Sequence, residues 1–192
     1  PLVATDMGAD FELPPEEVTV GVCVSVIDLG TQKNFWDNLS RQLLITWELP
    51  DQIMNDDRPF VISKFYTLSL NKKANLRKDL ESWRNKEFTQ EEIDAGFELK
   101  KLLGAWCNLG IVHEEKNDKT RAVIKSIASL MKEQRPRILK IKIYNDFLYF
   151  DFANFNHDEY MRIPEWIRKR MADSMEMQYR EGKMPSKAEE FG

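Results

Sequence analysis

Cysteine and histidine are scarce in this 192-residue chain, which has two of each. Cys23 and Cys107 both lie in apolar, strand-like stretches, where a free cysteine usually acts as a small buried hydrophobe. The two histidines, His113 and His157, stand in contexts unrelated to the cysteines, so no zinc-type ligand spacing can be assembled. We therefore expect no disulfide, no metal site and no cofactor.

Long apolar runs and glycine-rich loops are also lacking. No uncharged stretch approaches the ~20 residues needed to cross a bilayer, and the acidic residues 1–17 lack the pattern of a secretory signal. Because there is no phosphate-cradling loop and no nucleophile motif, nucleotide hydrolysis and acyl transfer have no support. With 42% hydrophobic and 31% charged residues, the sequence predicts a cytoplasmic protein of one domain with appendages, not associated with a membrane.

The net charge of -4 conceals two basic islands in an otherwise acidic chain. Residues 58–86 carry eight basic and two acidic side chains, and residues 119–144 carry eight basic side chains and one acidic one. If the fold brings the two islands together, they form one groove of positive potential that would attract a polyanion.

Alternating apolar and polar residues predict five strands. The strongest pattern covers residues 18–26, where valine alternates with small residues up to a turn signal at Asp28, Leu29 and Gly30. Helical spacing predicts one helix over residues 72–84, and Thr89 with Glu92 forms a capping box for a second, short helix that ends near Gly96. The other predicted strands cover residues 41–49, 60–70, 106–113 and 120–130.

Five strands with a helix between the third and fourth have the connectivity of an OB-fold, a five-stranded Greek-key barrel. We therefore predict a mainly β protein with an N-terminal arm (1–17), an OB-like domain (18–135), a C-terminal extension (136–180) and a flexible tail (181–192). The extension is expected to hold a hairpin over residues 138–152 and a helix from Pro164 to about Tyr179. An open mixed sheet with helices on one face would give the same pattern.

Several segments resemble a family of small, largely uncharacterised bacteriophage proteins. They include residues 26–32, 46–50, 63–70, 76–84, 102–104 and 163–168, so the likeness covers most of the chain. The resemblance implies an OB-fold, single-stranded-DNA-binding-like protein of phage replication or recombination, acting without catalysis and with phage or host replication proteins as further partners. It implies no particular binding residues.

The candidate DNA-binding residues therefore come from residue chemistry, which requires aromatic rings to stack bases and cations to contact phosphates. Tyr66 and Trp83 fit the core better than a binding surface. Lys64 has the register of inward-facing residues of its strand, whereas Phe65 points outward. The predicted stacking residues are Trp36, Phe65 and Trp106, and the predicted phosphate contacts are Lys64, Lys72, Lys73, Arg77, Lys78, Arg121 and Lys125.

Two other functions remain open. One is a protein-interaction adaptor or inhibitor that uses its acidic surface and the helix containing Trp166. The other is a metal-dependent nuclease built from Asp28 and residues 113–115 (His-Glu-Glu), although neighbouring residues of a strand point to opposite faces. The acidic, aromatic-tipped residues 188–192 would suit partner recruitment, and oligomerisation also remains open.

Overall fold

The computed structural model describes residues 12–34 and 36–183. The protein is mainly β with helices, as predicted, and within the described residues no helix is long and apolar enough to span a membrane. The strands are β1 (Val18–Lys33), β2 (Leu39–Ile53), β3 (Pro59–Thr67), β4 (Trp106–Lys116), β5 (Lys119–Ala128) and β6 (Leu148–Phe150). The helices are α1 (Asn75–Arg84), α2 (Gln90–Ala95), α3 (Arg135–Ile138), α4 (His157–Arg162), α5 (Glu165–Met171) and α6 (Met175–Arg180), with 3-10 turns at Leu99–Leu102, Lys132–Gln134 and Phe152–Asn154.

Strand β1 organises the sheet, whose order is β3-β2-β1-β4-β5 with β6 paired to β1. The first part of β1, residues 18–22, pairs with β4, and residues 22–33 pair with β2, both antiparallel. The turn predicted at Asp28 to Gly30 is wrong, because β1 continues through this point with a bulge. Gly30 has a φ of +74°, which a glycine adopts without strain, so the bulge bends the strand instead of ending it.

One face of β1, β2 and β3, called the inner face here, forms the main core with β4, β5 and α1. Trp47 on β2 and Trp83 on α1 pack at a ring-centroid distance of 5.7 Å. Leu76, Leu80 and Trp83 recur at helical spacing, so α1 turns its apolar stripe towards the sheet. The capping box of Thr89 at the start of α2 is confirmed.

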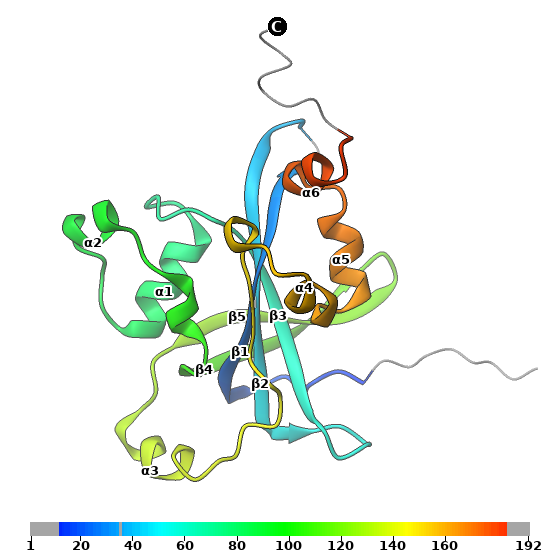
Figure 1. Ribbon diagram of the computed structural model, residues 1–192. Coiled ribbons are helices and arrows are strands. Elements are labelled where there is room, and N and C mark those ends of the chain that lie inside the picture. The colour runs from blue at the N-terminus through cyan, green and yellow to red at the C-terminus, as the bar shows by residue number, and fades with distance from the viewer. Residues whose placement is uncertain (1–11, 35, 184–192) are drawn as a thin grey trace, which may run out of the picture.

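The opposite, outer face of β1 and β2 is covered by the C-terminal helices (Figure 1), while α1 and α2 lie on the other side of these strands. Leu44 of β2 is fully buried in a second core with Ile163, Ile167 and Met171, which follow each other at intervals of four residues. The Glu176 carboxylate fixes α6 by accepting hydrogen bonds from the backbone N–H (2.6 Å) and hydroxyl (2.7 Å) of Thr31. The outer face is therefore largely closed by residues that follow the sheet in the sequence.

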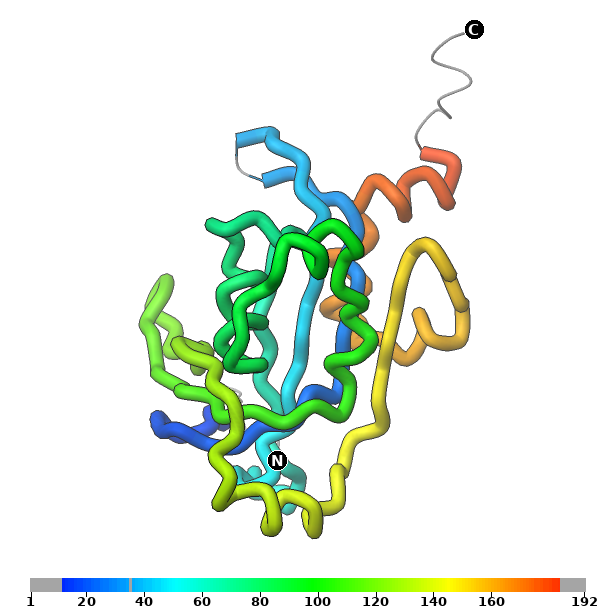
Figure 2. The backbone as a smooth tube through the Cα atoms, turned by 90° about the vertical axis from the view of Figure 1, so that its left-hand side faces the viewer, coloured from blue at the N-terminus to red at the C-terminus, as the bar shows by residue number. Residues whose placement is uncertain are grey.

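The predicted C-terminal hairpin over residues 138–152 is wrong. Residue 138 ends α3, and the chain then runs alongside the sheet as an irregular segment, yellow in Figure 2, to β6. β6 pairs in parallel with residues 25–27 of β1, since β4 leaves that edge of β1 unpaired. The single predicted last helix is also wrong, because it is divided into α5 and α6 at Ser174, whose side chain caps α6.

Candidate nucleic-acid interface

A hollow of about 610 Å³ lies at the C-terminal end of β3, where the chain turns into α1 and α5 approaches from the other side. We call it the β3 groove. Aromatic, cationic and amide-bearing side chains line it, and among the described residues that do so none is acidic. Its lining includes Gln42, Phe65, Asn71, Lys73, Asn75 and Arg170.

Two flat side chains, Phe65 and Arg170, line this groove, and a third, Trp166, packs on Phe65 beside it. The rings of Phe65 and Trp166 meet edge to face, with centroids 6.5 Å apart, and their exposed fractions are 42% and 56%. The Arg170 guanidinium lies 4.4 Å from the Phe65 centroid and donates a hydrogen bond of 2.9 Å to the Gln42 side-chain oxygen. Together they form a partly exposed, cationic stacking surface.

Local sequence explains how these side chains come to the groove. Strand alternation places Phe65 on the outer face of β3, because its neighbours Lys64 and Tyr66 point inward. On α5, Trp166 and Arg170 are four residues apart and lie beside the buried stripe of Ile163, Ile167 and Met171.

The turn before α1 presents Lys72 and Lys73. The Asn71 side-chain oxygen accepts a hydrogen bond from the Lys73 backbone N–H, which fixes the turn. Both lysines are exposed, and Lys73 lines the β3 groove. Lys78, on α1, is also exposed.

The two other predicted cations of this region pair with acids of α1. Lys64 Nζ lies 2.6 Å from the Asp79 carboxylate, which also accepts a 2.6 Å hydrogen bond from the Tyr66 hydroxyl. Burial and the nearby Asp79 raise the pKa of the Tyr66 hydroxyl, so it stays protonated and acts as a donor. Arg77 pairs with Glu81 at 2.6 Å. Arg77 also donates a 3.2 Å hydrogen bond to the Leu70 carbonyl before α1. Lys64 therefore holds α1 against β3, Arg77 holds it against the segment after β3, and both charges are largely balanced.

The two predicted cations of the second basic island, Arg121 and Lys125, do not line the β3 groove. Arg121 and Lys125 are exposed on β5, where the Glu114 carboxylate lies 3.8 Å from Arg121 and 2.5 Å from Lys125. The hydrogen bond from Lys125 lowers the pKa of Glu114, which keeps that carboxylate charged. Because α1 packs on β5, with the Ser82 hydroxyl donating to the Ile127 carbonyl, the elements that carry the two islands are neighbours.

The remaining predicted aromatics do not line the β3 groove. Trp36 is 76% exposed near the tip of the β1–β2 hairpin, beyond the end of β3. Trp106 is half-buried at the start of β4, and its carbonyl accepts a hydrogen bond from the Trp83 indole. Tyr66 and Trp83 are buried in the core, as predicted.

The residues considered for a metal-dependent nuclease have structural contacts. Asp28 pairs with Arg41 and accepts the backbone N–H groups of Gly30 and Phe152. The His113 ring lies 2.7 Å from the Pro14 carbonyl oxygen, so it holds the N-terminal arm on β4. Within the part of the chain that the structure describes, no group of three or more His, Cys, Asp or Glu side chains could hold a metal ion.

Arg170 lines the β3 groove and Trp166 packs on Phe65 beside it, but neither was among the predicted binding residues. The sequence does contain a signal for these two residues. Both lie outside the apolar stripe of their helix, and their spacing of four residues puts them on one helix face. The sequence does not show that this face lies beside Phe65. Residues 188–192, considered for partner recruitment, lie outside the described residues.

No protein-family model matches the chain, and no curated protein matches it either.

Proposed function

We propose that this protein binds single-stranded DNA without sequence preference, in the β3 groove. The observation that carries the proposal is a hollow lined by Phe65, Lys73 and Arg170 without acidic lining residues, beside which the Trp166 ring packs on Phe65.

The chemistry of the groove suits unpaired nucleotides. Exposed π surfaces stack on any base, which gives affinity without sequence preference. Lys73 and Arg170 supply positive charge for phosphates, and the amides of Asn71 and Asn75 can hydrogen-bond to sugars or base edges. The acidic net charge elsewhere would limit indiscriminate binding of polyanions.

We further infer that the sheet is an OB-like barrel left open between β3 and β5. Support comes from the strand connectivity, from β1 lying between β2 and β4, and from β3 and β5 approaching within 8 Å between Cα atoms. Helix α1 packs against both of these edge strands. In folds of this type the outer face of the second and third strands binds oligonucleotides, and Phe65 lies on that face.

From the resemblance to phage proteins we infer that this binding serves phage DNA replication or recombination. In such a role the protein protects or presents a strand and performs no chemical step.

A fluorescence titration with poly-dT at several salt concentrations tests the proposal. Stacking contributes about 1–3 kcal/mol per base, so the double variant Phe65→Ala/Trp166→Ala should bind roughly tenfold more weakly or worse. The affinity of the unaltered protein should fall steeply with salt, because phosphate binding releases counterions.

Leu139→Ala is the matched control, because Leu139 is 86% exposed and does not line the β3 groove. Its affinity for poly-dT should equal that of the unaltered protein. Binding that is independent of salt, or a folded double variant with unchanged affinity, would contradict the proposal.

A further inference from the structure

A second groove surrounds Trp106 and shares no lining residue with the β3 groove. It consists of two hollows, of about 580 and 310 Å³, that meet at Trp83, Arg84, Ala105 and Trp106. One hollow extends towards α3, and the other towards Phe97 and the 3-10 turn at Leu99–Leu102. We call the pair the Trp106 groove.

The lining of this groove is mainly apolar. Leu130, Ile138 and Leu139 line the first hollow, and Leu80, Phe97 and Leu102 line the second. Leu139 is 86% exposed at the rim, and Met131, next to Leu130, is 59% exposed. Aliphatic side chains exposed beside an apolar hollow are typical of a surface that another molecule covers.

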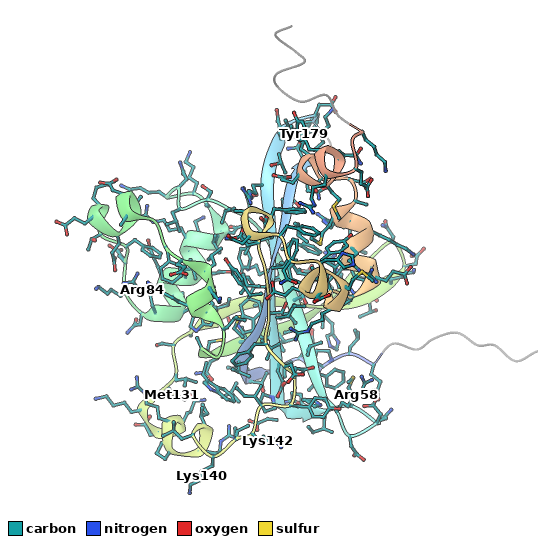
Figure 3. The ribbon with its side chains drawn as sticks, viewed as in Figure 1. Arg58, Arg84, Met131, Lys140, Lys142 and Tyr179 are labelled. Atoms are coloured by element: carbon teal, nitrogen blue, oxygen red, sulfur yellow. The ribbon has the colours of Figure 1, made fainter. Side chains whose placement is uncertain are left out.

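The charges of the lining residues are all positive. Arg84, Lys101 and Arg135 line the two hollows, with no carboxylate among the described lining residues. Arg84 pairs with Glu92 at 2.6 Å, whereas Lys101 and Arg135 form no ion pair with any residue that the structure describes. Figure 3 shows Arg84 and Met131 on the same side of the molecule, with Lys140 further along that side.

We propose that the Trp106 groove binds a short acidic peptide segment of a partner protein, whose apolar side chains enter the two hollows. The hollows would hold aliphatic or aromatic anchors, and carboxylates of the peptide would meet Lys101 and Arg135. The positive charges of the groove favour a negatively charged peptide, and the apolar lining supplies most of the contact area.

A nucleic acid fits this surface less well. Most hydrogen bonds in protein–DNA complexes go to phosphates and sugars, and others read the base edges. Leucine and isoleucine side chains can form none of these hydrogen bonds. The β3 groove, by contrast, has the amides and hydroxyls that such contacts need. The peptide site does not rest on the proposed DNA binding, and each can fail without the other.

The test is selection of a random dodecapeptide display library on the immobilised full-length protein. Enriched peptides should be acidic, with two or more large apolar residues, and should bind by fluorescence polarisation. Leu139→Glu and Arg135→Glu should each weaken that binding by about tenfold or more, because one places a charge at the apolar rim and the other reverses a cation. Both side chains are exposed, so both variants should fold.

Two controls separate this site from the DNA site. Lys73→Glu should leave peptide affinity unchanged, and Leu139→Glu should leave poly-dT affinity unchanged. The proposal is overturned if no peptide is enriched, if the enriched peptides are not acidic, or if both Trp106-groove variants still bind them. It is also overturned if poly-dT displaces the peptide and Leu139→Glu weakens poly-dT binding, because the groove would then be a nucleic-acid surface.

Discussion

The two faces of β2 are built from one strand but are used differently. On the inner face Leu43, Ile45, Trp47 and Leu49 are all at most 2% exposed and join a single core. The outer face is divided among three tasks: Leu44 lies under the C-terminal helices, the Thr46 hydroxyl bonds to Ser63, and the buried Glu48 holds the segment before β6. The inner face therefore fixes the fold, and the outer face decides which part of the sheet stays accessible.

The cations of this region follow the same division. Lys64 points to the inner side and is balanced by Asp79, whereas Lys73 is exposed in the β3 groove. The two lysines carry the same charge but differ in their availability for a ligand. A cation that is not paired with an acid of the protein can bind a phosphate without first breaking a salt bridge.

The largest effect should come from breaking the inner face. Trp47→Ala removes a fully buried indole that packs on Trp83, and we expect it to lower the free energy of unfolding by about 3–5 kcal/mol. The indole nitrogen of Trp47 has no hydrogen-bond partner among the described residues, so the loss is one of packing. Urea unfolding followed by circular dichroism measures it.

The neighbouring outer-face variant Thr46→Ala is the control for Trp47→Ala. It removes one partly buried hydroxyl contact, worth about 1 kcal/mol or less. If both variants lose the same free energy of unfolding, the inner face of β2 contributes no more to stability than the outer face.

The next effect concerns the buried carboxylate of the outer face. Glu48 is 1% exposed and accepts hydrogen bonds from the backbone N–H groups of Tyr144 (2.9 Å) and Asn145 (2.8 Å). Glu48→Ala leaves these donors without their acceptor, and we expect a loss of about 3 kcal/mol. Hydrogen exchange should show faster exchange of those two amides in particular.

Glu48→Gln keeps one acceptor oxygen and should lose less stability than Glu48→Ala. Residues 43–47 serve as an internal reference, because their amides belong to the β1–β2 and β2–β3 ladders. If the amides of residues 43–47 exchange faster by the same factor as those of Tyr144 and Asn145, then Glu48 stabilises the whole sheet and not the segment before β6 in particular.

Much of the fold could be predicted because it depends on local patterns. Alternation predicted the five long strands to within a few residues at most ends, and the capping box at Thr89 predicted the start of α2. The end of β1 was wrong because a glycine bulge and a turn share the same local signal. The C-terminal hairpin was wrong because β6 pairs with a strand far away in the sequence, which no local pattern reports.

The candidate site was less predictable, since it depends on tertiary contacts. Phe65 could be placed on the outer face by alternation, and Lys73 by its position in a polar turn. The pairing of Lys64 with Asp79 joins a strand to a helix, and the position of Trp166 beside Phe65 joins two segments about 100 residues apart. Sequence shows the types of residue available for a site, but long-range packing decides which of them meet.

The smallest effect tests the two lysines directly. Lys73→Met should weaken poly-dT binding a few-fold and reduce the slope of log affinity against log salt by about 0.7, the value for one phosphate contact on a single strand. Lys64→Met should leave both quantities unchanged and instead lower the free energy of unfolding by about 1 kcal/mol, because Asp79 loses one of its two donors. Each lysine is thus the control for the other. If Lys64→Met weakens poly-dT binding and Lys73→Met does not, then the salt bridge between Lys64 and Asp79 opens when DNA binds. Lys64 is in that case part of the binding surface.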